Sequence, residues 1–201
     1  MCNLFREVCI AEFGRQNKIG GQGLVVQIDE SHIHTRKQNV GRILKSQTWV
    51  FGGIDEEGKI FMERVECRNA QTLTEVLLRR VEPGSIIFSD CWRGYVVVNE
   101  HFKYYQVDHS KNFVNPVDGT NTQKIEATWG VLKRMLKMKG SRKCKNLDGY
   151  IAEFLFRSRY KEDPFTSFFS LKKKHSDMTE HHLTAHDPTV LVPLMQFDLQ
   201  I

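Results

Sequence analysis

Three acids that lie far apart in the sequence could do chemistry together. Asp29 and Asp90 each end a short, largely apolar run that is typical of a buried strand. If these strands are parallel neighbours, both acids emerge at the carboxyl edge of one sheet, where ligands of open α/β sheets bind. Glu126 lies near the start of a helical pattern, whose apolar side could pack on the sheet and bring this acid to the same edge.

Converging carboxylates repel one another, so they tolerate a shared position only with partial protonation or bound cations. Hard oxygen ligands suit Mg²⁺ or Mn²⁺, and two such ions can activate an attacking oxygen and stabilise a leaving oxygen in phosphoryl transfer. We therefore expect Asp29, Asp90 and Glu126 to be metal ligands and catalytic residues at a two-ion site. The alternative is that these acids face water, because a chain of this length offers many such triples.

The elements that must position these acids follow from hydrophobic periodicity and turn residues. The pattern predicts, in order, a helix at 4–13, a strand at 24–33, a hairpin with arms 48–54 and 59–65, a helix at 69–81 with Asn69 as its cap, a strand at 85–91, a helix at 93–102, a strand at 104–110, a long helix at 121–140 and a helix at 146–163. Strands that alternate with helices indicate an α/β sheet layered by helices.

Composition bounds the class of protein. A chain of 201 residues fits one domain of ordinary size with an appendage. The five cysteines are scattered without a C-x-x-C pair, which argues against a disulfide framework and a zinc ribbon within this chain. The sequence has no apolar run long enough for a membrane helix, and its first residues lack the apolar segment of a secretory signal. We therefore expect an intracellular protein with no membrane partner.

The positive charge gathers in two blocks, although the net charge of +5 is modest. Residues 36–45 and 133–145 are rich in Lys and Arg and contain no acid, which favours a nucleic-acid footprint. On a helix, Lys133 and Lys137 fall within about 60° of Glu126. The candidate DNA contacts are Arg36, Lys37, Arg42, Lys133, Arg134 and Lys137. The alternative is an ordinary solvated face.

Several blocks of the sequence resemble those of one family, in the same order. They are "QIDESHIHTRKQNVGR", "SDCWRGY", "VDHSKNFVNPVDGTNTQKIEATWGVLKR" and "YIAEFLFRSRY". This arrangement resembles Merlin-type DDE transposases, which have bacterial insertion-sequence relatives. The resemblance covers roughly residues 19 to 160.

The resemblance implies an RNase H-like fold, in which helices flank a mixed sheet. It also implies DNA strand cleavage and strand transfer with divalent metal, and it places the acidic triad of the family on Asp29, Asp90 and Glu126. The implied partners are the DNA of transposon ends and target, together with at least one further copy of the chain, because two DNA ends must be joined. The expected location is the nucleus in a eukaryote and the cytoplasm otherwise.

The sequence departs from the family pattern at two points. Asn121 stands where the family usually has a histidine, and only about twenty residues precede the first strand, where relatives carry a DNA-binding region. We therefore expect residues 1–18 to form a short helix as a remnant of that region, 19–162 the catalytic domain and 163–201 a tail. Two alternatives remain open: an inactive or host-adopted transposon-derived nucleic-acid-binding protein, and a structure-specific nuclease of the same fold.

Overall fold

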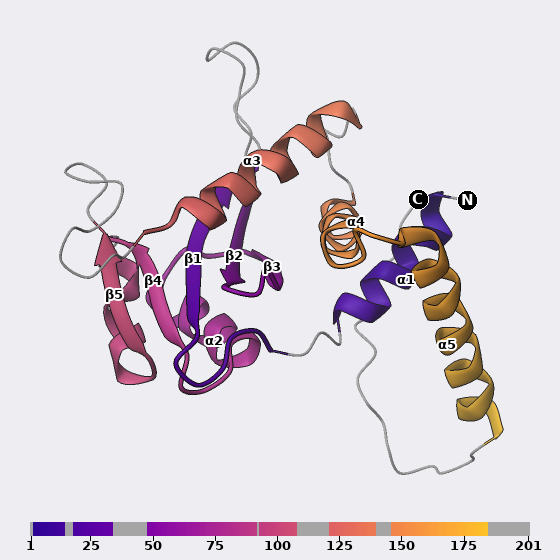
Figure 1. Cartoon of the computed structure of the whole chain (residues 1–201), viewed down its shortest axis with the longest axis horizontal. Helices are drawn as coiled ribbons and strands as arrows, with labels where there is room; N and C mark the ends of the chain where they lie inside the picture. Colours follow the sequence, from indigo (N-terminus) through magenta and orange to yellow (C-terminus); the bar gives the residue numbers. More distant parts are fainter. Residues whose placement is uncertain are drawn as a thin grey trace. The chain divides into compact units, whose positions relative to one another are not determined.

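The fold is built on a mixed sheet of five strands (Figure 1). The computed structural model describes residues 2–14, 18–33, 48–91, 93–107, 121–139 and 146–184. The strands are β1 (Val25–His32), β2 (Trp49–Asp55), β3 (Ile60–Val65), β4 (Ile86–Asp90) and β5 (Lys103–Val107), in the order β3-β2-β1-β4-β5. The first three strands are antiparallel to one another, whereas β4 runs parallel to β1 and β5 parallel to β4. This is an RNase H-like sheet, so the expected fold class is confirmed.

Six helices accompany this sheet in the described part of the chain. They are α1 (Cys2–Gly14), α2 (Ala70–Arg80), the 3₁₀ helix η1 (Arg93–Glu100), α3 (Gln123–Met138), α4 (Leu147–Arg159) and α5 (Pro164–Thr184). The chain forms two compact units, residues 1–164 and 165–201. In the described part of the chain, no helix is both long and apolar enough to cross a membrane.

Helix α5 lies in the range that the sequence pattern assigned to a weakly patterned tail. Proline is well suited to the first position of a helix, where its missing N–H has no partner to lose, and Pro164 occupies that position in α5. Periodicity did not reveal this helix, because charged and apolar residues do not separate cleanly along it. The division into residues 1–18, 19–162 and 163–201, which the sequence suggests, remains a prediction.

The core lies on the face of the sheet that α2 covers. Val26 and Ile28 point to this face from β1 and are fully buried with Leu73 and Leu77 of α2. Asn69 caps α2, because its side chain accepts a hydrogen bond from the backbone N–H of Thr72 at 2.8 Å. Each fully buried aliphatic side chain contributes roughly 1.5–3 kcal/mol, so the predicted apolar stripe is enough to hold α2 in place.

Helix α3 covers the opposite face, with Ile125, Trp129 and Leu132 buried beneath it. Its approach to β2 is close: a Cβ atom added to Gly52 would lie 2.9 Å from the Trp129 ring. Glycine therefore makes room for the indole, and Trp129 is buried against the sheet. Figure 1 shows α2 and α3 on opposite sides of the sheet.

A buried carboxylate joins α4 to two other helices. The Glu153 side chain is 3% exposed and accepts hydrogen bonds from Arg6 of α1 at 3.3 Å and from Arg157 of α4 at 3.0 Å. Lys139, just beyond the end of α3, donates to the same carboxylate. An edge-to-face contact between Phe5 and Phe156, with ring centroids 5.1 Å apart, adds to the packing of α1 on α4.

Candidate active site

Asp29 and Asp90 lie on neighbouring parallel strands and on the same face of the sheet. The ladder between β1 and β4 pairs Val26 with Ile87 and Gln27 with Phe88, an offset of 61 residues. The same offset carries Asp29 to Asp90, two residues further along both strands. Side chains alternate between the two faces of a strand, so both acids share the face of Gln27, which is the α3 face. Neighbouring strands lie about 4.8 Å apart, which makes these two acids near neighbours.

Gln27 brings the start of α3 to this face. Its side-chain oxygen accepts hydrogen bonds from the backbone N–H groups of Lys124 at 2.9 Å and Ile125 at 3.2 Å. Its amide nitrogen donates to the side-chain oxygen of Asn121 at 2.9 Å. The first N–H groups of a helix have no partner within the helix, and Thr122 at the cap position provides no side-chain cap. A residue of β1 therefore caps α3 from outside the helix.

This cap fixes the position of Glu126, which follows Ile125 directly. The Thr122 hydroxyl donates a hydrogen bond to Glu126 Oε1 at 2.8 Å and orients the carboxylate. Gln27, two residues before Asp29 on the same face, thus holds the helix turn that carries the third acid. Sequence reasoning registered Gln27 only as an interruption of an apolar strand; a polar residue flanked by buried apolar positions is the signal that could have revealed it.

The three acids interact through their charges. Burial raises the pKa of Asp29 to about 7, and the negative charges of Glu30, Asp90 and Glu126 add to this effect, whereas a hydrogen bond from the Glu30 backbone N–H opposes it. A carboxyl group with this pKa is half protonated near neutral pH. The structure thus brings Asp90 and Glu126 close enough to Asp29 for their charges to raise its pKa.

Glu30 lies on the opposite face of β1 and has a different role. Its side chain is fully buried and forms an ion pair with Arg68 at 3.3 Å, and Arg68 also lies over the Trp49 ring, 4.9 Å from its centroid. Burial raises the pKa of Glu30, and the neighbouring Tyr95 hydroxyl and Arg68 partly offset this rise. Tyr95 is itself fully buried and belongs to the hydrophobic core on this face of the sheet.

The acids present only oxygen donors, which suits Mg²⁺ or Mn²⁺. Among the residues that the structure describes, no three His, Cys, Asp or Glu side chains are arranged to hold a metal ion. Asp29, Asp90 and Glu126 therefore interact at a distance without forming a closed coordination shell. The raised pKa of Asp29 still fits a cation, because a bound positive charge would offset both the burial and the neighbouring negative charges that raise it.

The candidate DNA contacts fall into two groups. Lys133, Arg134 and Lys137 lie on the exposed side of α3, beyond Glu126, and none of them forms an ion pair with another described residue. Arg36, Lys37 and Arg42 lie outside the described residues. The observed helix therefore brings one of the two predicted basic groups to the face that carries Glu126.

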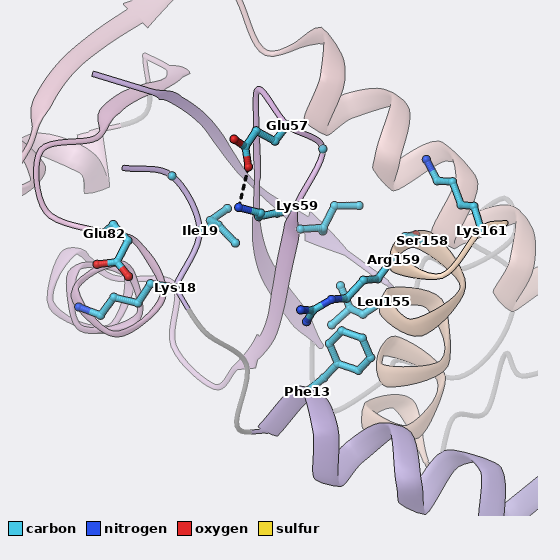
Figure 2. A pocket seen from close by; sticks show the side chains of 13 residues that line it. Phe13, Lys18, Ile19, Glu57, Lys59, Glu82, Leu155, Ser158, Arg159 and Lys161 are labelled. Atoms are coloured by element: carbon cyan, nitrogen blue, oxygen red, sulfur yellow. Dashed lines mark ion pairs between the residues drawn. The ribbon is translucent and has the colours of Figure 1, made fainter. Parts of the chain in front are cut away.

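A cavity lies elsewhere in the fold (Figure 2). It has a volume of about 570 Å³ and is bordered by the turn between β2 and β3, the segment 18–20 and the end of α4. Because Asp55 beside that turn pairs with Val26 near the start of β1, this cavity is at the other end of the strand from Asp29. Lys59 and Arg159 face it, and Lys59 forms an ion pair with Glu57 at 2.6 Å. It is therefore separate from the three acids.

A family model decides the classification. The model described as "ISXO2-like transposase domain" matches residues 20–159, which is well over half of the chain. The chain belongs to this family. It is therefore a DDE transposase domain, as the blocks around Asp29, Asp90 and Glu126 predict, and the matched range agrees with the extent of the resemblance. The assignment to Merlin-type transposases is finer than this match and stays a prediction.

Two further comparisons add little to the classification. The transposase domain is similar to a chain in the crystal structure of the Mos1 strand transfer complex, with a TM-score of 0.30 and 11% sequence identity. The match covers 82% of this chain and 60% of that one, so the transposase domain spans less than two thirds of the Mos1 chain. A comparison with curated proteins gives no significant match.

Proposed function

We propose that this chain is the catalytic domain of a metal-dependent transposase, which cleaves DNA strands at element ends and joins them to target DNA. The observation that supports this proposal most directly is the register of β1 and β4, which places Asp29 and Asp90 on one face of the sheet, beside the helix turn that carries Glu126. In a domain of the transposase family, an acidic region at the end of two parallel strands suits phosphoryl transfer, which needs no protein nucleophile when divalent ions are bound.

Asp29, Asp90 and Glu126 would hold two divalent ions. When bound, Mg²⁺ or Mn²⁺ polarises a phosphodiester and lowers the pKa of the attacking water. The remaining residues position this site: Gln27 anchors the first turn of α3, and Thr122 orients the Glu126 carboxylate. These contacts matter because an error of about 1 Å in a catalytic group can cost about 100-fold in rate.

The exposed cations of α3 would bind the DNA substrate. Lys133, Arg134 and Lys137 follow Glu126 on the same helix, so they can contact phosphates next to the proposed metal site. Contacts of this kind are independent of base sequence and weaken as salt rises, because each neutralised phosphate releases counterions. Since strand transfer joins two DNA ends, we propose that the active species contains at least two copies of the chain.

The test compares the wild-type protein with Asp90→Asn in the presence of Mn²⁺ and a labelled duplex that carries the terminal sequence of the element. We expect cleavage by the wild type and a loss of at least about 100-fold in Asp90→Asn, because a catalytic carboxylate is removed, with unchanged DNA binding. Asp148→Asn is the matched control, because Asp148 is 52% exposed and lies on α4. Equal cleavage by all three proteins would contradict the catalytic assignment, whereas binding without cleavage would favour a transposon-derived DNA-binding protein.

A further inference from the structure

Gly130 occupies a position in α3 that the fold itself does not explain. It is the eighth of sixteen residues in this helix and is exposed. Glycine is among the least favourable residues inside a helix, because it loses the most backbone freedom. A Cβ atom added at Gly130 would meet no atom of the described residues within 4 Å, so packing against this part of the chain does not exclude a larger residue.

The other glycines with described surroundings differ in this respect. Five of the nine have positive φ angles, which favour glycine. In three of the remaining four, an added Cβ would come within 3.0 Å of a neighbouring atom; these three are Gly52, Gly53 and Gly149, and the fourth is Gly130. Of these nine, Gly130 alone has neither a positive φ angle nor a close neighbour among the described residues.

The location of Gly130 indicates a different reason for the glycine. Gly130 lies one turn beyond Glu126 and one turn before Lys133, and Lys137 follows one turn later. With 100° of rotation per residue, these four residues fall within about 60° on one side of α3. All four are exposed. The glycine is therefore a bare position on the helix surface, between the catalytic acid of the proposed site and two cations.

We propose that the sugar–phosphate backbone of the DNA substrate crosses α3 directly over Gly130. This inference rests on the proposed function, and it adds the path of the strand across the site. Phosphate contacts with Lys133 and Lys137 would fix the position of the strand. The missing side chain lets the strand approach the helix backbone closely and so reach Glu126, and a less stable helix is the cost of this approach.

The inference predicts effects of opposite sign on stability and binding. Gly130→Ala should raise the melting temperature by about 2–4 °C, because alanine is the better helix former. Gly130→Gln should also keep or raise the melting temperature, but it should weaken binding of a fluorescein-labelled DNA duplex by at least about tenfold, because its side chain holds the strand away from the helix. Gly130→Ala should weaken binding by a smaller factor.

Val131→Gln is the matched control, because it places the same side chain at an exposed position that points about 140° away from Glu126. Its binding should equal that of the wild type. If Gly130→Gln binds the duplex as tightly as Val131→Gln does, or if Gly130→Ala lowers the melting temperature, the inference is wrong. The binding assay is run with Ca²⁺, without turnover, so its outcome is separate from the cleavage test with Asp90→Asn.

Discussion

Replacing Asp29 by Asn should stabilise the metal-free protein above neutral pH. The pKa of Asp29 is about 7 in the folded chain, against 3.8 for an unperturbed aspartate. A folded-state pKa that is raised means that stability falls as pH rises from about 4 to about 7, because the unfolded chain releases this proton more easily. The asparagine side chain removes the negative charge and can still accept the hydrogen bond from the Glu30 backbone N–H.

The size of the effect follows from the pKa difference. About three pKa units correspond to about 4 kcal/mol, and Asp29 is partly exposed, so solvent screening reduces the expected gain to about 2 kcal/mol. Urea unfolding of both proteins, in EDTA and at a series of pH values, measures this gain. The difference should be largest above pH 7 and should shrink toward pH 4, where Asp29 is protonated in the folded wild type.

Adding Mg²⁺ should narrow the gap, because a cation that binds among the acids stabilises the wild type more than Asp29→Asn. Asp148→Asn serves as the control, since its exposed pair with Arg64 is worth only about 0–1 kcal/mol. If Asp29→Asn is less stable than the wild type at high pH, or if the difference does not vary with pH, Asp29 does not have the buried, negatively charged surroundings that the structure gives it. The argument for a shared metal site would then lose its basis.

Two further substitutions test the contacts that hold the site and the helices together. Gln27→Leu should cost about 1–3 kcal/mol in unfolding experiments, because the N–H groups of Lys124 and Ile125 lose their acceptor. It should also lower the rate of DNA cleavage while leaving nonspecific DNA binding intact. Unchanged cleavage would contradict the role of Gln27 in placing Glu126. Glu153→Gln should cost about 2 kcal/mol in unfolding experiments, because Arg6, which is 13% exposed, loses its counter-charge. The other two cations, Lys139 and Arg157, are more exposed and lose less. Burial raises the pKa of Glu153, but Lys139 and Arg157 outweigh burial, so the net pKa is lowered. The Glu153 carboxylate therefore stabilises the folded chain above its unfolded pKa, and this stabilisation is lost as pH falls. An equal loss of stability in Glu153→Gln at acidic and neutral pH would refute this account.

Sequence patterns alone determined the strands, most of the helices and the identity of the acids. Alternating and 3.6-residue periods mark one face of an element as apolar, so β1 and α3 were predicted close to their observed bounds. Asp90 is the last residue of β4, as predicted, whereas β1 continues beyond Asp29 to His32. Helix α5 was missed, since its apolar residues do not follow one clear stripe.

Only the tertiary structure decided which side chains act together. Periodicity assigns a residue to a face, but it does not say which helix covers that face. The capping of α3 by Gln27 and the pairing of Glu30 with Arg68 therefore could not be predicted from the sequence. Those partners are 97 and 38 residues apart in sequence. The raised pKa of Asp29 has the same origin, because it depends on burial and on charges that strand register and helix packing bring near it.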